Sequence, residues 1–245
     1  MINNNWFEGL TSRRLGDGLV WKNEILPSLV STSASLPELF TAIENLTKLN
    51  CSKANLKSLC GLEYSFNLGK LNCSSNYLED FISLRRCTEL KYLDASNNKI
   101  KTIDDIENLP IEELYLSFNN LKFIDFSNWK FPRRLKILHI DNNKLQYVRG
   151  LDRLKNLVEL NLSNNLLTEV SHYEFLPSLI DLDLSNNPDL KGKLNKVEGF
   201  KYIDIRNTKI NEIKPRLSRE EEELLFMIEQ MRSRKNLMNV EGCNY

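Results

Sequence analysis

Apolar residues recur along most of the chain in one frame: apolar, two variable, apolar, one variable, apolar, two variable, asparagine, one variable, apolar. The clearest copy is the stretch 157–167, LVELNLSNNLL. Copies of this frame begin at Leu46, Leu68, Leu90, Ile111, Leu135, Leu157, Leu179 and Phe200. The intervals between these positions are 22, 22, 21, 24, 22, 22 and 21 residues. Such a regular repeat predicts a solenoid in which each copy forms one coil.

Each coil is expected to place a short strand, such as Glu159 to Leu162, on the concave side and a return segment on the convex side. The apolar positions point inward and stack on those of the next coil, because no single repeat can bury its own apolar face. Short return segments favour 3₁₀ turns or extended chain, with one short helix over residues 38–46. With a faint further copy at Leu26, the sequence predicts an α/β solenoid of about eight to nine repeats with a parallel concave sheet.

The asparagine of the frame follows each strand, where the chain turns away from the sheet. Its amide both donates and accepts hydrogen bonds, so it can satisfy buried backbone groups of its own coil and of a neighbouring coil. The residues at this position, called the ladder asparagines below, are Asn76, Asn98, Asn119, Asn143, Asn165 and Asn187. Ala54 and Thr208 occupy it in the terminal copies, where repeats are usually atypical.

The repeats divide the chain into three parts. Residues 1–25 form an N-terminal leader or cap, 26–213 form the solenoid, and 214–245 form a C-terminal helical cap. Ser218, followed three residues later by Glu221, is a capping-box pattern that predicts the start of this last helix. An apolar stripe at helical spacing follows, and it is expected to close the end of the core.

The stretch 90–121, LKYLDASNNKIKTIDDIENLPIEELYLSFNNL, resembles the twenty-two-residue class of leucine-rich repeats. That class is typified by the nuclear regulatory subunit of protein phosphatase 1, and the resemblance implies an intracellular binding scaffold. The stretches WKNEIL, LNCSSNYL and FIDFSNWKFPRRLKIL are also similar to the repeat domain of yeast spindle-pole-body scaffolds of the centriolin-like group. That resemblance implies a fragment or reduced relative of a protein that anchors mitotic-exit or septation-initiation signalling. Neither resemblance identifies a residue of this chain that would contact a partner.

The variable positions of each strand are expected to face outward in three rows across the concave sheet. The first row is Lys48, Lys70, Tyr92, Glu113, Ile137, Glu159, Asp181 and Tyr202. The second row is Asn50, Asn72, Asp94, Tyr115, His139, Asn161, Asp183 and Asp204. The third row is Ser52, Ser74, Ser96, Ser117, Asp141, Ser163, Ser185 and Arg206.

These rows carry lysines toward the N-terminus, aromatic residues in the centre and carboxylates toward the C-terminus. An aromatic centre with a charged flank is typical of a protein-binding surface, so we expect a basic or amphipathic segment of another protein to dock there. The predicted partner-binding residues are Tyr92, Asp94, Glu113, Tyr115, Ile137, His139, Glu159, Asp181, Asp183, Tyr202 and Asp204. The alternative is a sheet face that is merely solvated.

The overall charge is balanced, with 33 basic and 33 acidic residues. This argues against a nucleic-acid or acidic-membrane binder that relies on bulk charge. The sequence also predicts no secretory signal and no membrane-spanning segment. The chain has five cysteines without close CxxC pairs, which fits buried or free thiols in the cytoplasm or nucleus better than zinc or disulfides. The second resemblance adds the cytoskeleton or spindle pole body as a location.

No catalytic, metal-binding or cofactor motif is recognisable, and the sequence predicts a non-enzymatic adaptor without a cofactor. The rival hypothesis is an enzyme site formed by His139, Asp181 and Asp183. The sequence is also compatible with a regulatory subunit of a phosphatase-like enzyme, a pathogen effector that binds host proteins, or a self-assembling structural element. The oligomeric state stays open.

The longest repeat, of 24 residues, contains KFIDFSNWKFPRRL and so combines aromatic with basic residues. Its two extra residues are expected to bulge outward, since insertions in repeats map to loops. Trp129 either protrudes there as a second partner site or packs into the core.

Overall fold

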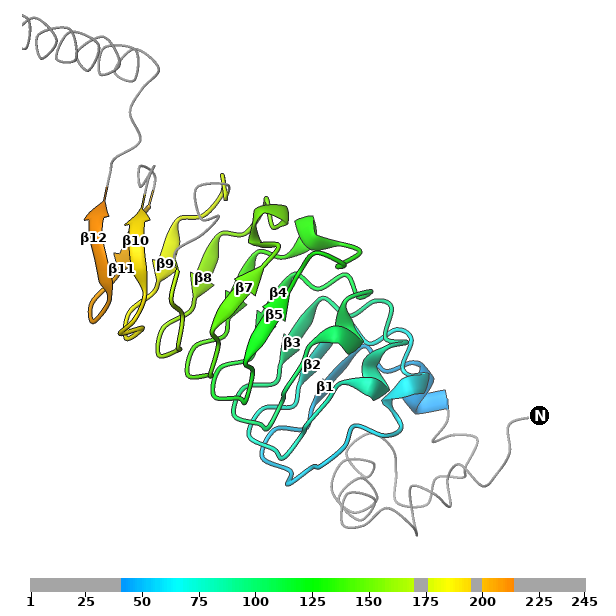
Figure 1. Cartoon of the computed structure of the whole chain (residues 1–245). Coiled ribbons are helices and arrows are strands. Elements are labelled where there is room, and N and C mark those ends of the chain that lie inside the picture. Colours follow the sequence, from blue (N-terminus) through cyan, green and yellow to red (C-terminus); the bar gives the residue numbers. More distant parts are fainter. Residues whose placement is uncertain (1–40, 170–175, 195–199, 214–245) are drawn as a thin grey trace, which may run out of the picture.

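The computed structural model describes residues 41–169, 176–194 and 200–213, which form one solenoid of stacked coils (Figure 1). The N-terminal leader, the faint copy at Leu26 and the C-terminal cap lie outside these residues. A helical turn at 41–44 is the described end of the helix expected over 38–46. The solenoid otherwise contains only short strands and single 3₁₀ turns within the described residues.

One face of the solenoid is a parallel sheet of eight strands in the order β1-β2-β3-β4-β6-β8-β9-β11. These strands are β1 (Lys48–Asn50), β2 (Lys70–Asn72), β3 (Tyr92–Asp94), β4 (Glu113–Tyr115), β6 (Ile137–His139), β8 (Glu159–Asn161), β9 (Asp181–Asp183) and β11 (Tyr202–Asp204). Each strand comes from one copy of the repeat frame, so the eight registers of the sequence become the eight strands of the concave sheet. The prediction of a leucine-rich-repeat solenoid with a parallel sheet is confirmed.

The opposite face is formed by the return segments, and five of them contain 3₁₀ turns. These are η2 (Leu62–Tyr64), η3 (Ile82–Leu84), η4 (Asp104–Ile106), η5 (Pro132–Arg134) and η6 (Leu151–Arg153). Two pairs of short parallel strands also form along the returns, namely β5 (Phe123–Asp125) with β7 (Tyr147–Arg149) and β10 (Lys191–Leu194) with β12 (Lys209–Ile213). The expectation of 3₁₀ turns and extended chain is therefore confirmed.

The core consists of apolar columns that run the length of the solenoid. At the strand centres, the side chains of Leu71, Leu93, Leu114, Leu138, Leu160 and Leu182 are at most 1% exposed. The next inward column contains Cys51 and Cys73, which are buried as small hydrophobic side chains, as predicted. Burial raises the pKa of the Cys51 thiol to about 12 and that of Cys73 well above its usual value, so both stay protonated.

The ladder asparagines join neighbouring coils through their amides, as the sequence predicts. The Asn143 Nδ2 donates to the backbone oxygens of Ile140 and Asp141 in its own coil and of Leu116 in the preceding coil. Its Oδ1 accepts from the backbone N–H of Leu121, at 3.0 Å. Five further asparagines repeat the pattern, so buried backbone groups at each of these turns are paired.

The long repeat buries two of its aromatic residues, Phe126 and Trp129, whereas Phe123 is exposed. Trp129 is 2% exposed and packs edge-on against Phe126, with ring centroids 4.9 Å apart. The alternative in which Trp129 protrudes is therefore wrong, and the alternative in which it packs into the core is confirmed. Gly150, with φ of 70°, sits where an added Cβ would lie 2.7 Å from the backbone nitrogen of Ser127, so this close contact requires glycine.

Candidate functional site on the concave sheet

The sheet register aligns the first two predicted rows residue by residue. Each first-row residue pairs with the first-row residue of the next strand, and each second-row residue does the same. In every strand from β1 to β9 the central residue is buried while its two neighbours are half-buried or exposed. The predicted binding residues therefore lie on one continuous face, except that Asp204 is 6% exposed.

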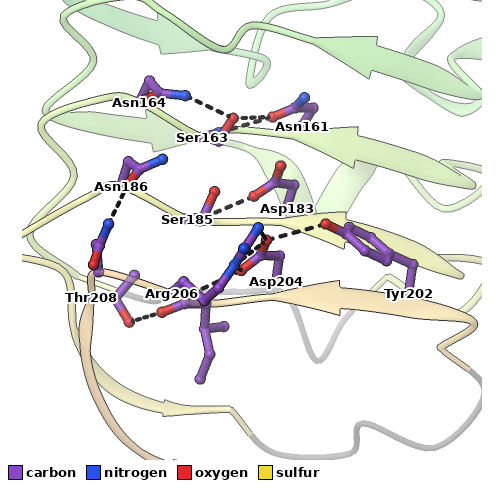
Figure 2. A network of polar contacts seen from close by, with 12 residues as sticks. Asn161, Ser163, Asn164, Asp183, Ser185, Asn186, Tyr202, Asp204, Arg206 and Thr208 are labelled. Carbon is purple, nitrogen blue, oxygen red and sulfur yellow. Dashed lines mark hydrogen bonds and ion pairs between the residues drawn. The ribbon is translucent and has the colours of Figure 1, made fainter.

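Most of the second row has a structural role that sequence reasoning did not identify. In six repeats this residue is an aspartate or asparagine whose Oδ1 accepts a hydrogen bond from the backbone N–H two residues later. In Figure 2, Asp183 makes this contact with Ser185, and Asn161 contacts Ser163. These side chains cap the turn where the chain leaves the sheet, as short carboxylate and amide side chains often do.

The second row departs from this pattern only at Tyr115 and His139, on the neighbouring strands β4 and β6. Neither side chain forms the capping contact among the described residues; instead their rings meet edge-on with centroids 5.1 Å apart. In this part of the sheet the third-row side chains contact each other, with the Ser117 hydroxyl donating to the Asp141 carboxylate at 2.5 Å. The two central repeats thus have half-buried rings in place of a turn cap.

The rings belong to a chain of contacts that crosses five strands. The Lys70 ammonium lies 3.9 Å above the centre of the Tyr92 ring, and that ring lies 5.5 Å from the Tyr115 ring. At the other end, His139 Nε2 and Glu159 Oε1 are 2.7 Å apart. Cation–π and edge-on contacts of this kind fix the rings in place, so the aromatic surface is held ready before any partner arrives.

Both tyrosines keep their protons at physiological pH. Partial burial, together with the Glu113 carboxylate that accepts a hydrogen bond from the Tyr115 hydroxyl at 3.2 Å, raises the pKa of Tyr115 to about 12. Burial and the neighbouring Asp94 and Glu113 also raise the pKa of Tyr92. The centre therefore presents neutral rings with hydrogen-bonding hydroxyls, the composition found at protein-binding surfaces.

The acidic flank is smaller than the sequence suggests. Asp204 accepts hydrogen bonds from Tyr202 and from the backbone and side chain of Arg206 (Figure 2). The Arg206 guanidinium lowers the pKa of Asp204 to about 2, so this carboxylate is ionised and already neutralised within the chain. Within the described residues, Asp181 and Asp183 form no ion pair and remain the accessible acidic pair of β9.

Phe118 is a further candidate that sequence reasoning missed. It follows β4 at a turn position that has positive φ in all eight repeats, and this position holds asparagine in five of them. Phe118 has φ of 57° and is 58% exposed. A bulky side chain in this conformation is unusual and costs free energy, which points to a function. The signal was available in the sequence, because Phe118 occupies an asparagine position in the same repeat as Tyr115.

The rival enzyme site does not assemble as one cluster. Strand β8 lies between β6, which carries His139, and β9, which carries Asp181 and Asp183, so about 10 Å separates them at ordinary strand spacing. The imidazole faces Glu159 instead. Within the described residues, no three side chains of metal-binding type come together, and no helix there is long and apolar enough to cross a membrane.

Comparison with known families and sequences identifies the repeat itself. The model of the Leucine Rich Repeat family matches residues 156–176, which include the copy that begins at Leu157. No curated protein sequence matches the chain significantly.

Solved structures share the fold. An internalin (inlF) from Listeria monocytogenes is similar over 85% of this chain and 70% of its own, with a TM-score of 0.55 and 20% identity. The ectodomain of the Arabidopsis thaliana receptor kinase GASSHO1/SCHENGEN3, solved in complex with CASPARIAN STRIP INTEGRITY FACTOR 2, gives a TM-score of 0.60 and 23% identity. That match covers 74% of this chain but only 25% of the receptor chain. A Leptospira interrogans repeat protein matches over 74% of this chain and 63% of its own, with a TM-score of 0.50 and 22% identity. At these identities the likeness establishes the fold alone.

Proposed function

Because the chain folds as a leucine-rich-repeat solenoid, we propose that it is a non-enzymatic scaffold that binds another protein on its concave sheet. Extended repeat arrays present such curved surfaces for binding, and leucine-rich-repeat folds typically act as interaction modules. The observation that carries the proposal is the loss of the turn cap at Tyr115 and His139. Two adjacent repeats have partly accessible rings in place of a stabilising contact, which a purely structural sheet does not require.

The proposed partner presents a basic or amphipathic segment. Its apolar side chain packs on the Tyr92, Tyr115 and His139 rings, with Ile137 beside them in the first row. Its basic residues lie over Glu159, Asp181 and Asp183. Apolar contact with the rings supplies most of the affinity, while the carboxylates orient the segment and speed its association.

The test is affinity purification from the source cell with the wild-type chain and with Tyr115→Ala and Asp181→Lys variants, with bound proteins identified by mass spectrometry. We expect one stoichiometric partner with the wild-type chain and at least tenfold less of it with each variant. The matched controls are Tyr77→Ala, a tyrosine 46% exposed outside the sheet, and Asp152→Lys in η6. Equal recovery by both sheet variants would reject the concave face as the binding surface.

The cellular setting is proposed as the cytoplasm or nucleus, including a spindle-pole or other cytoskeletal structure. Cys51, Cys73 and Cys87 are buried thiols and Cys60 is an exposed one, which suits a reducing compartment. Fluorescence microscopy of the tagged chain in the source cell tests this setting. A signal confined to the secretory pathway or the cell exterior contradicts it.

A further inference from the structure

Lysines lie at the β1–β2 end of the concave sheet and carboxylates lie at the β8–β9 end, with Asp94 and Glu113 between them. Building on the proposed function, we propose that the sheet selects an extended segment of fixed charge order: acidic at one end, apolar or aromatic in the centre, and basic at the other end. The occupant is thus a polarised segment of a protein partner rather than a uniformly basic one. The acidic end of the bound segment would lie over β1 and β2, whose residues are not among the binding residues predicted from the sequence.

The basic end of the sheet consists of Lys48 and Lys70. They are register partners in the first row of β1 and β2, so their side chains leave the same face at neighbouring positions. Lys48 is exposed, and within the described residues no ion pair involves either lysine. The Lys70 ammonium contacts the Tyr92 ring, and this cation–π contact leaves it able to bind a carboxylate.

The acidic end of the sheet consists of Glu159, Asp181 and Asp183 on β8 and β9. The capping contact from the Ser185 backbone occupies one carboxylate oxygen of Asp183 and leaves the other accessible. Asp204 does not extend this end, because Arg206 neutralises it.

The carboxylates between the two ends are held by contacts within the chain, since Asp94 accepts from the Ser96 backbone and Glu113 accepts from the Tyr115 hydroxyl. At the strand starts, Glu112 lies 2.7 Å from the Lys136 ammonium and 3.9 Å from that of Lys91. At the strand starts, these three side chains together carry a net charge of about one positive unit. Along the rows, the two ends therefore carry opposite charges, and charges of this kind orient a bound segment.

The length of the segment follows from the strand spacing. From β1 to β9 the sheet has six gaps in the order β1-β2-β3-β4-β6-β8-β9, or about 29 Å at about 4.8 Å per strand. An extended chain covers about 3.3 to 3.6 Å per residue, so about eight or nine residues cross this distance. In a segment of this length, an acidic cluster at one end contacts Lys48 and Lys70 while a basic cluster at the other end contacts the carboxylates of β8 and β9.

The experiment is selection from a displayed library of random twelve-residue peptides on the full chain, followed by fluorescence anisotropy with the recovered peptides. We expect peptides with an acidic cluster and a basic cluster about eight residues apart around an apolar centre, in either chain direction. A Lys48→Glu, Lys70→Glu double variant should bind these peptides at least tenfold more weakly. Selection on that variant should yield peptides without the acidic cluster. A Lys122→Glu, Lys130→Glu variant, altered outside the main sheet, serves as the charge-matched control.

Two outcomes overturn the proposal, and they are distinguishable. If the recovered peptides need Tyr115 but lack an acidic cluster, or bind the Lys48→Glu, Lys70→Glu variant within twofold of the wild type, the charge order is wrong while the binding face stands. If no recovered peptide loses affinity for a Tyr115→Ala variant, the concave binding site itself is wrong, and the charge order falls with it.

Discussion

The repeats of β4 and β6 differ from those of β8 and β9 at one position of an otherwise common plan. All four stack on the same apolar columns and have a ladder asparagine after the strand. In β8 and β9 the second-row side chain caps its own turn, whereas in β4 and β6 it is a ring directed at its neighbour. The comparison teaches that an aspartate or asparagine at this position stabilises its own turn whether or not it also binds a partner. Rings at the same position have no such structural role, so they are the stronger candidates for binding.

The common plan predicts the largest effect. Asn143→Ala in a central coil and Asn165→Ala in a capped coil each remove one accepted and three donated hydrogen bonds. Each should lower the free energy of unfolding by about 3 kcal/mol or more, because buried backbone groups lose their partners. Urea denaturation measures this, with Asn156→Ala, which loses one exposed contact, as the control below about 1 kcal/mol. A much smaller loss for Asn143 would show that the central coils are built differently.

Phe118→Asn should stabilise the protein by about 1 kcal/mol or more, since asparagine tolerates the positive φ of this turn better than phenylalanine does. The melting temperature should rise by about 2 to 4 °C, as measured by circular dichroism. The reciprocal variant Asn97→Phe should lower it by a similar amount. If Phe118 contacts the partner, Phe118→Asn should also weaken binding. Greater stability with unchanged binding would show that the strained Phe118 backbone has no role in binding.

Exchanging the two kinds of second-row residue tests the comparison directly. Asp183→Ala removes a turn cap and should cost about 1 kcal/mol. Tyr115→Asn loses ring contacts worth about 1 kcal/mol but can form the cap found in the other repeats, so its stability should stay close to the wild type. Denaturation and partner capture measured together should therefore show Asp183→Ala weaker in both stability and binding, and Tyr115→Asn weaker in binding with nearly unchanged stability. A large stability loss in Tyr115→Asn would mean that the rings are structural.

The smallest expected effect concerns pH. Because the pKa of Asp204 is lowered from 3.8 to about 2, its ion pair with Arg206 stabilises the folded state above about pH 4. That contribution is lost as the pH falls from about 4 to about 2. The exposed guanidinium limits it to about 1 kcal/mol. Thermal unfolding of the wild type and Asp204→Asn should differ at pH 7 and converge near pH 2, and a constant difference would exclude this origin.

The sequence was sufficient for the fold because each coil repeats one local problem. Strand positions, register and the ladder all follow from the recurring Leu157 to Leu167 frame, since a one-residue slip would expose every leucine. The strand pair β5–β7 could not be foreseen in the same way. It includes the stacking of Phe123 on Tyr147, whose rings lie 5.9 Å apart, and the return segments have no fixed sequence frame from which this contact could be read.

The sequence predicted which residues line the site, but it did not predict which of them contact one another. Alternation alone places Tyr115 and Asp204 on the same face, yet it does not reveal that Arg206 neutralises Asp204. Likewise, periodicity left Trp129 undecided, because a bulge and a core residue look alike until the neighbouring Phe126 is placed in space. Pairing between residues of different repeats depends on three-dimensional distance, which a one-dimensional pattern does not contain.

Each ladder asparagine bonds to two coils at once, and this has a mechanical consequence. The coils cannot slide or separate individually without breaking amide contacts on both sides, so the array is rigid and the spacing between its coils is constant. A molecule lying across several strands meets anchoring points whose separations hardly fluctuate. Discrimination between correct and incorrect spacing along that molecule then comes from the rigidity of the backbone, and it extends to chemical groups that no single repeat could recognise.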